Sequence, residues 1–412
     1  MAFDPATELQ EFLVFGEFGD VNPSITDSST YTFLSTEKME ALFDHEIEGC
    51  FLYSRHLNPS DKYLADALAR MEGGESAQVM SSGMAAIATT LLELCSAGDE
   101  IVSGRTIYGG TYALLKNLLP RFGITTRFVD ITDLNAVRAQ ITPRTRVLYC
   151  ESMSNPLLEV SDIPALGELA HHHGLRLVVD NTFSPMILSP LRLGADIVVH
   201  SLTKFINGTS DCVAGCVVSS SEFIHSLNDI NQGPAMLMGP VLDSFRAASI
   251  LKNLHSLHIR MAKHSRNAMY LAERFVEVGC PVHYPGLTSH PHHLLLTRVM
   301  NPGYGHGGII AVDAGSSEQA NRLMVRMQES HVGYLAVSLG YFKTLFSAPG
   351  HSTSSEIPEK ERACMGLSDG LIRISVGLDN DIERTWRIIE TCMQEVKMPT
   401  LCRGNRSVSS VV

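Results

Sequence analysis

Short apolar runs alternate with segments of helical periodicity between Ala77 and Ser219. Apolar runs of four to seven residues are typical of strands buried on both faces, and amphipathic segments between them are typical of crossover helices. The alternation therefore predicts a parallel sheet covered by helices, an α/β fold. Strands are expected at Ala77–Ser81, Glu100–Ser103, Thr125–Val129, Arg146–Glu151, Leu175–Asp180, Asp196–His200 and Ala214–Val218. Helices are expected at Met84–Cys95, Tyr112–Phe122 and Ile163–His173.

The pattern changes after Leu251, where a long helical segment precedes SHPHHLLL, IIAVDAG and LIRISVGL. This mixture predicts a smaller α+β domain, and a chain of 412 residues is longer than one hydrophobic core usually serves. We expect four regions: an N-terminal arm (1–58) contacting a neighbouring subunit, a large domain (59–255), a small C-terminal domain (256–396) and a flexible tail (397–412).

Composition narrows the class of protein. The net charge of −12 has no long single-sign runs, which argues against a nucleic-acid surface. Nine cysteines without a Cys-x-x-Cys pair favour free thiols in a reducing compartment. Neither a basic-then-apolar leader nor an apolar stretch of membrane-spanning length occurs, so we expect a cytoplasmic protein without membrane contact.

Two residues at strand ends suggest the chemistry. Lys204 closely follows the apolar run ADIVVH, and Asp180 ends the preceding run in VVDNTF. A lysine amine forms a Schiff base with an aldehyde, and an aspartate pairs with a protonated pyridine nitrogen. Together they predict a pyridoxal phosphate site. The run His171–His173 precedes Gly174, which fits a helix C-terminus better than a metal site, and no metal is expected.

Other polar residues have two interpretations each. Ser82-Gly83-Met84 begins a predicted helix, where free N–H groups bind anions but a serine is also an ordinary N-cap. Ser201 and Thr203 either donate to the same phosphate or form a turn.

The same holds for residues elsewhere in the chain. Tyr53 and Arg55 suit phosphate binding or an ordinary solvated loop. Tyr108 before two glycines suits stacking on a pyridine ring or a place in the core. Arg373 lies in an apolar strand and needs an anionic partner, which is either structural or a substrate carboxylate.

Taken in order, the segments YSR, SSGM, YGGT, ESMSNP, VVDNTF, HSLTK, SLG and IRISVG resemble the cysteine/methionine-metabolism family of pyridoxal-phosphate enzymes over nearly the whole chain. The resemblance implies a PLP-dependent transferase fold of type I (aspartate aminotransferase-like), with a mostly parallel seven-stranded sheet in the large domain. It also implies a homotetramer built from two active dimers, acting on a small sulfur amino acid.

The resemblance also implies a role for each matching residue. Lys204 would join the cofactor, act as a base and pass on protons; Asp180 would hold the ring nitrogen, and Tyr108 would stack on the ring and protonate the leaving thiolate. Residues matching the phosphate-binding positions are Ser82, Gly83, Met84, Ser201 and Thr203, with Tyr53 and Arg55 supplied by the neighbouring subunit. Residues matching the substrate-binding positions are Arg373, Ser338, Asn155 and Val337.

Within the family, the substrate is indicated by departures from its motifs. Members acting on cystathionine carry an arginine and a glutamate where this chain has Ala113 and Val337, so a short uncharged thioether is favoured. AVSLG resembles the methionine γ-lyases, which predicts α,γ-elimination of L-methionine. Gly110 and Thr209 differ from many bacterial members, and cystathionine γ-lyase or O-acetylhomoserine sulfhydrylase activity is the alternative.

Two other classes are weighed against this prediction. The fold could serve as a binding protein without turnover, but the intact Lys204, Asp180, Tyr108 and Arg373 argue against it. A nucleotide-binding oxidoreductase would fit the α/β alternation, yet no G-x-G-x-x-G follows any predicted strand.

Overall fold

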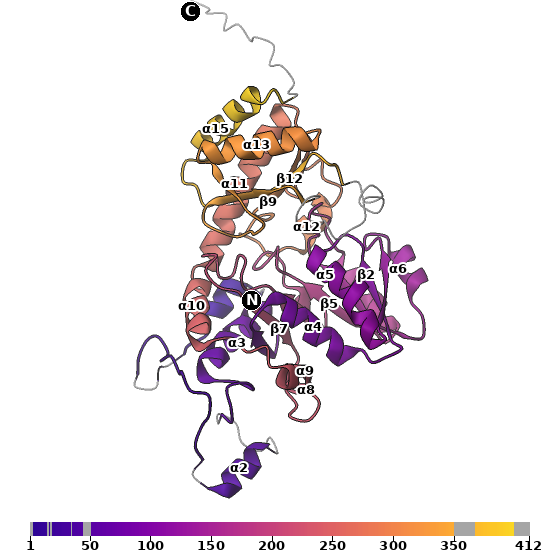
Figure 1. The fold of residues 1–412 in the computed structure, drawn as a ribbon, viewed down its shortest axis with the longest axis vertical. Coiled ribbons are helices and arrows are strands. Elements are labelled where there is room, and N and C mark those ends of the chain that lie inside the picture. Colours follow the sequence, from indigo (N-terminus) through magenta and orange to yellow (C-terminus); the bar gives the residue numbers. More distant parts are fainter. Residues whose placement is uncertain are drawn as a thin grey trace, which may run out of the picture.

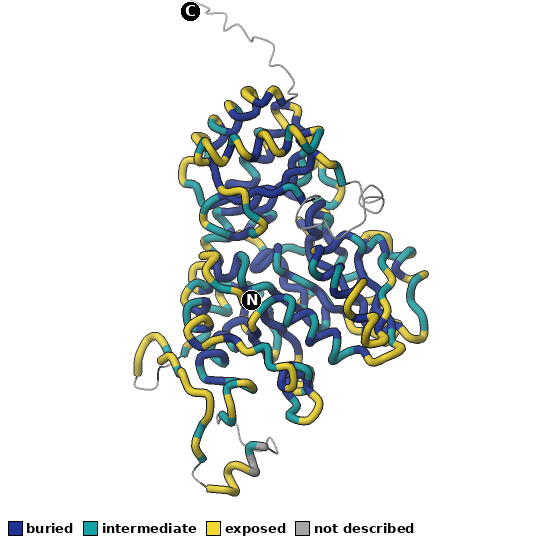
Figure 2. Tube along the Cα trace, in the orientation of Figure 1, coloured by how far each residue is buried: buried dark blue, intermediate teal, exposed yellow. Residues whose placement is uncertain are grey.

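The computed structural model describes residues 3–14, 16, 19–33, 35–43, 51–349 and 367–398. Two lobes, each built on one sheet, are joined by the long helix α11 (Leu257–Glu277) (Figure 1). Buried residues gather inside both lobes, as Figure 2 shows. One apolar cluster fills the small lobe, and the main cluster of the large lobe extends into the small lobe through Ile309, Ala311 and Leu371. The prediction of an α/β fold with a mostly parallel sheet and a smaller second sheet is confirmed.

The large lobe contains a seven-stranded sheet with the order β1-β7-β6-β5-β4-β2-β3. Its strands are β1 (Ser76–Met80), β2 (Glu100–Gly104), β3 (Thr125–Val129), β4 (Thr145–Glu151), β5 (Arg176–Asp180), β6 (Ile197–His200) and β7 (Gly215–Ser219). The strands β3, β2, β4, β5 and β6 pair in parallel, whereas β7 runs antiparallel to both neighbours. The sheet is therefore mostly parallel, as expected, with β7 as the strand that runs the other way. Only turns connect β6 to β7, and a parallel pair needs a longer crossover, usually a helix.

Helices cover both faces of this sheet, each face having its own apolar cluster. They are α3 (Pro59–Glu72), α4 (Gly83–Leu94), α5 (Gly109–Ala113), α6 (Leu134–Gln140), α7 (Ile163–His172), α8 (Ser221–Leu227), α9 (Pro234–Met238) and α10 (Ser244–Leu254), with a short 3₁₀ turn η3 (Pro190–Leu193).

The single helix expected over Tyr112–Phe122 is wrong. After α5 the chain continues as a π-helical turn, η1 (Leu114–Leu118), and a 3₁₀ turn, η2 (Leu119–Phe122). Pro120 lies near the end of the segment, and a proline lacks the N–H that an α-helix would use there.

The small lobe contains a five-stranded sheet with the order β10-β11-β12-β9-β8. Its strands are β8 (Val282–His283), β9 (Ile309–Asp313), β10 (Gly333–Leu335), β11 (Thr344–Ser347) and β12 (Leu371–Ser375), and its helices besides α11 are α12 (His293–Val299), α13 (Ser317–Glu329) and α15 (Ile382–Glu395). All pairs except β10–β11 are antiparallel. The sheet packs on α11, α13 and α15 through an apolar cluster that includes Phe275 and Trp386.

The N-terminal region is partly attached to the large lobe and partly extended. Helix α1 (Pro5–Glu11) contacts α3, and the Tyr304 hydroxyl donates to the Asp4 carboxylate. Helix α2 (Thr36–Phe43) extends away from the body in Figure 1 and is largely exposed in Figure 2. The predicted tail lies outside the described residues beyond Met398. Among the described helices, none is both long and apolar enough to cross a membrane.

Candidate active site

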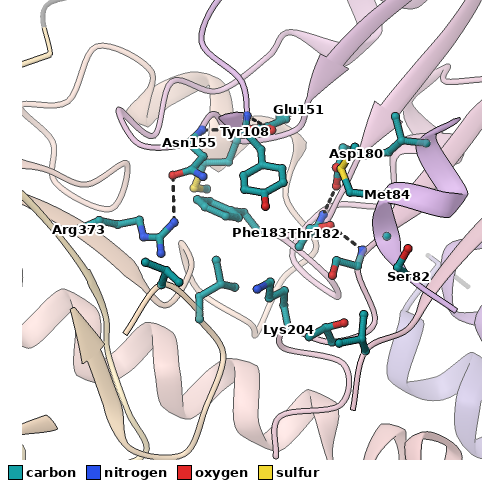
Figure 3. Close-up of a pocket in the computed structure, with 18 residues that line it drawn as sticks. Ser82, Met84, Tyr108, Glu151, Asn155, Asp180, Thr182, Phe183, Lys204 and Arg373 are labelled. Atoms are coloured by element: carbon teal, nitrogen blue, oxygen red, sulfur yellow. Dashed lines mark hydrogen bonds between the residues drawn. The ribbon is translucent and has the colours of Figure 1, made fainter. Parts of the chain in front are cut away.

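A pocket lies where β4, β5 and β6 end, at the carboxyl edge of the large sheet, and the small lobe forms its opposite side (Figure 3). In open α/β sheets this edge is the usual place for ligands. Eleven of the sequence-predicted site residues line the pocket: Ser82, Gly83, Met84, Tyr108, Asn155, Asp180, Ser201, Thr203, Lys204, Val337 and Arg373. Folding thus brings together residues that are up to 291 positions apart, from Ser82 to Arg373.

Asp180, the last residue of β5, is held by neutral groups. Its Oδ1 accepts a hydrogen bond from the Thr182 N–H at 3.0 Å, and its Oδ2 lies 3.5 Å from the Tyr149 hydroxyl. Burial raises the pKa of Asp180, while the hydrogen bonds from Thr182 and the nearby His200 oppose that rise. A buried carboxylate of this kind is stabilised in its charged form by a cation beside it, which a protonated pyridine nitrogen provides.

The Lys204 amine points into the same pocket from the turns after β6 (Figure 3). Its Nζ donates to the Ser338 hydroxyl across the two lobes at 3.2 Å. Burial, helped by the positive charge of Arg373, lowers the pKa of Lys204 to about 8. A lysine with a lowered pKa supplies more of the neutral amine that attacks an aldehyde.

The first turn of α4 and the loop after β6 form one end of the pocket. The Ser82 hydroxyl accepts from the Ala85 N–H, which makes Ser82 the N-cap of α4. Gly83 lies so close to Ser201 that a Cβ at position 83 would fall 2.8 Å from the Ser201 Cβ. The helix start, with its free N–H groups and the neighbouring hydroxyl, is suited to an anion such as a phosphate.

Arg373 forms the opposite end, because β12 carries it from the small sheet toward the large lobe. Its Nη1 donates to the Asn155 Oδ1 at 3.1 Å and its Nη2 to the Ser338 carbonyl at 3.3 Å. Arg373 is 2% exposed, and its Nε has no hydrogen-bond partner among the described residues. Burial lowers the pKa of Arg373 to about 10, so a carboxylate ligand would stabilise the charged form.

Three residues of the site were given no role by the sequence interpretation. Thr182 fixes both Asp180 and the Ser201 N–H, which donates to its Oγ1 at 2.8 Å. Tyr149 lies beneath Asp180, and Glu151 ends β4 with its carboxylate turned toward Tyr108. Thr182 and Glu151 belong to the motifs VVDNTF and ESMSNP, so the motifs were the available signal; Tyr149 had none beyond its buried strand.

Apolar side chains make up much of the remaining lining of the pocket. They are Ile87, Met153, Phe183, Val213, Val337 and Leu339. Ala113, the other position that suggested a short substrate, lies in α5 and is not among the lining residues of this chain.

Tyr53 and Arg55 do not line this chain's pocket. The Arg55 Nη1 donates to the Met236 carbonyl at 2.8 Å, and the Tyr53 side chain is 43% exposed. The cofactor-binding role that the resemblance gave them therefore requires a second copy of the chain.

Comparison with known proteins agrees with this site. The family model described as "Cys/Met metabolism PLP-dependent enzyme" matches residues 13–384. The chain therefore belongs to the Cys/Met metabolism family of PLP-dependent enzymes, and pyridoxal phosphate is its cofactor. The pocket fits this group, since it combines a lysine of lowered pKa, a buried aspartate and a helix start in one place.

Individual relatives narrow the similarity. The chain is 44% identical over 394 residues to the methionine gamma-lyase of Arabidopsis thaliana, covering 94% of this chain and 89% of that protein. It is 39% identical over 366 residues to the L-methionine gamma-lyase of Pseudomonas putida, covering 88% and 90%. A solved structure described as an O-acetylhomoserine (thiol)-lyase from Campylobacter jejuni superimposes with a TM-score of 0.87 at 27% identity, covering 95% of this chain and all of that one, and it contains a pyridoxyl-lysine phosphate.

Proposed function

We propose that this enzyme converts L-methionine and water to methanethiol, 2-oxobutanoate and ammonia. The observation that carries the proposal is the distribution of charge in the pocket. Its ionisable lining residues are Tyr108, Glu151, Asp180, Lys204 and Arg373, and Val337 adds only an apolar group. A substrate with a second charged end would lose its hydration there without gaining a partner, whereas a methyl thioether would not.

The cofactor would be held by residues from both ends of the pocket. We assign its ring nitrogen to Asp180 and its phosphate to the first turn of α4, namely Ser82, Gly83 and Met84, with Ser201 and Thr203 beside them. Pyridoxal phosphate held in this way would supply an electron sink beside the substrate's α carbon. Holding it at a buried aspartate keeps the ring nitrogen protonated.

The roles of the protein side chains follow from their positions. Arg373, supported by Asn155 and Ser338, would bind the α-carboxylate and orient the amino acid. Lys204, whose pKa is lowered to about 8, would take the α-proton and move it between carbons. Tyr108 would protonate the departing thiolate sulfur.

The test is the simultaneous detection of 2-oxobutanoate and methanethiol from L-methionine, with L-cystathionine at equal concentration beside it. We expect release of both products from methionine and little turnover of cystathionine. Turnover of cystathionine alone, or sulfide-dependent conversion of O-acetylhomoserine, would instead support one of the two alternative activities.

A substitution at Val337 sharpens this test. Val337 lines the pocket although it is 62% exposed in the single chain, so Val337→Glu adds a charge that bound methionine would partly desolvate. We expect kcat/KM for methionine to fall about tenfold. Val325→Glu, on the exposed face of α13, is the matched control and should leave both activities unchanged. Equal methionine activity in both variants would contradict the proposed role of Val337.

We also propose that the working form is a homotetramer of two active dimers, in which Tyr53 and Arg55 complete the neighbouring subunit's site. The support is their distance from this chain's own pocket, together with the extended segment around α2. A cytoplasmic location is supported by the free cysteines, of which Cys95, Cys150, Cys216, Cys280 and Cys392 are buried.

A further inference from the structure

Glu151 is a buried carboxylate whose hydrogen bonds go to the main chain. It ends β4, is 7% exposed and lines the pocket. Its Oε1 accepts from the Tyr108 N–H at 2.7 Å, and its Oε2 accepts from the Asn155 N–H at 3.0 Å (Figure 3). One rigid side chain thus holds two backbone segments that come from different loops.

The first of these segments depends strongly on that hydrogen bond. Tyr108 is the N-cap residue of α5, yet its own side chain makes no capping hydrogen bond. Its ring is 41% exposed and lies over Gly110, where a Cβ would fall 2.5 Å from the ring's Cε1. Since the ring rests on the backbone of its own turn, the place of the phenol is set by how that backbone is anchored.

The second segment leads to the carboxylate clamp. Asn155, whose N–H Glu151 holds, accepts from Arg373 through its Oδ1 at 3.1 Å. Arg373 in turn donates to the Ser338 carbonyl at 3.3 Å, and the Ser338 hydroxyl accepts from Lys204 at 3.2 Å. A continuous set of hydrogen bonds therefore runs from Tyr108 through Glu151 to the clamp and on to the lysine amine.

We infer that Glu151 is a positioning residue, which sets the Tyr108 phenol and the Asn155–Arg373 clamp at a fixed separation and so ties the thiolate-protonating group to the bound α-carboxylate. This inference rests on the proposed function, because it assigns the phenol to the leaving sulfur. The alternative is a purely structural role, in which Glu151 stabilises the loops without affecting turnover.

The two roles differ in what Glu151→Gln changes. Glutamine keeps the shape of the side chain but presents an NH₂ group to one of the two backbone N–H donors, so that donor loses its partner. We expect kcat for L-methionine to fall about tenfold to a hundredfold per cofactor-loaded site. We also expect a several-fold rise in KM, with cofactor content and melting temperature close to those of the wild type.

Three further measurements separate positioning from structure. The dissociation constant for glycine, which has the α-carboxylate but no side chain to eliminate, should rise by the same factor as KM in a spectral titration. In a Tyr108→Phe background, Glu151→Gln should lower kcat less than twofold while still weakening glycine binding. Glu159→Gln, which changes a carboxylate of the same loop that does not line the pocket, should leave all of these values unchanged.

Glu151→Asp is a second variant, which keeps the carboxylate but shortens the side chain. It should likewise lower kcat, raise KM and weaken glycine binding while cofactor content and melting temperature stay close to those of the wild type. Unchanged kcat and KM per loaded site in both variants, or equal kcat losses with and without the Tyr108 hydroxyl, would overturn the inference. Glycine binding tests the clamp even in an enzyme that releases no 2-oxobutanoate. A failure of the proposed function is therefore distinguishable from a failure of the inference about Glu151.

Discussion

The surroundings of Lys204 change the chemistry of its amine. Burial lowers its pKa from 10.5 to about 8 in the folded protein. Below about pH 8 the amine is charged in both the folded and unfolded states, so folding carries the full cost of desolvating it. Between about pH 8 and 10.5 the folded protein loses this proton while the unfolded chain keeps it, and the cost disappears.

Lys204→Met should therefore stabilise the cofactor-free protein at pH 7, by up to about 3 kcal/mol in the free energy of unfolding. The advantage should shrink as the pH rises from about 8 toward 10.5, because the wild type becomes more stable over that window. Denaturant unfolding of both proteins at several pH values measures it. Lys252→Met, an exposed change on α10, is the control, and a pH-independent difference would contradict the expected titration.

Arg373→Ala should raise KM for methionine by about a hundredfold, since a sequestered charge-assisted pair is typically worth a few kcal/mol. Arg373→Lys should recover only part of this loss, because an ammonium lacks the planar fork that holds Asn155 and Ser338. Steady-state kinetics measures both, with Arg322→Ala, an exposed change on α13, as the control. A KM unaffected by Arg373→Ala would remove this residue from the clamp.

At the residue scale, sequence motifs located the pocket-lining residues but not the geometry between them. Lys204 and Asp180 could be chosen because each follows an apolar strand in a recognisable motif. Glu151 could not be given its role, since its partners are main-chain N–H groups that any residue type carries. The role of Met153 and Phe183 in the pocket lining could not be predicted either, because apolar residues in a sequence usually indicate core positions.

At the element scale, the start of α4 and the loop after β6 depend on each other's closeness. A Cβ at position 83 would fall 2.8 Å from the Ser201 Cβ and 2.9 Å from its Cα. Such distances require the backbone after β6 to shift, not merely a side chain to rotate.

Gly83→Ala should therefore weaken retention of pyridoxal phosphate by at least about tenfold, because the two edges of the proposed phosphate site would separate. Equilibrium dialysis against the free cofactor measures the change. Gly104→Ala is the matched control, since the nearest neighbour of its Cβ would lie at 3.4 Å, an ordinary contact. If both variants retain the cofactor like the wild type, α4 does not hold the phosphate.

The elements themselves could largely be predicted from the periodicity of the chain. Every expected strand of the large sheet lies within two residues of an observed one, because short apolar runs between turns identify buried strands well. Strand direction was harder to predict. Strand β7 would run parallel to β6 only if the segment after Lys204 contained a crossover helix, and that segment contains only turns. The π-helical and 3₁₀ turns after α5 could not be predicted from periodicity, although Pro120 is a residue that disfavours a continuous α-helix.

At the scale of the whole molecule, the chain separates its own Tyr53 and Arg55 from its own pocket. Mixing variant subunits tests whether Arg55 completes the site of a neighbouring subunit. An Arg55→Ala subunit retains Lys204, and a Lys204→Ala subunit retains Arg55. Each variant alone should have little activity. A mixture refolded together should regain a measurable part of the wild-type activity, as hybrid dimers contain one complete site.

The control for this experiment is a mixture of the Lys204→Ala and Arg373→Ala variants. Both of these residues line the same chain's pocket, so a hybrid of the two contains no complete site. At low methionine concentration this mixture should gain no activity beyond the residual activity of Arg373→Ala. Recovery in neither mixture would contradict the shared site, and sedimentation of the wild type would report the number of subunits. Such an arrangement was implied only by resemblance, since no local pattern in one chain specifies what a second copy contributes.

The pocket takes its parts from two lobes. Asp180 and Lys204 lie at or just after strand ends of the large sheet, whereas Arg373 lies on β12 and Val337 just after β10 of the small sheet. Arg373 and Val337, two of the groups assigned to the substrate, are therefore encoded in a different stretch of the sequence from the groups assigned to the cofactor. Substitutions confined to the segment around β10 and β12 can alter which amino acid is accepted while the cofactor's surroundings stay intact. A fold divided in this way lends itself to the divergence of substrate preference around one preserved chemistry.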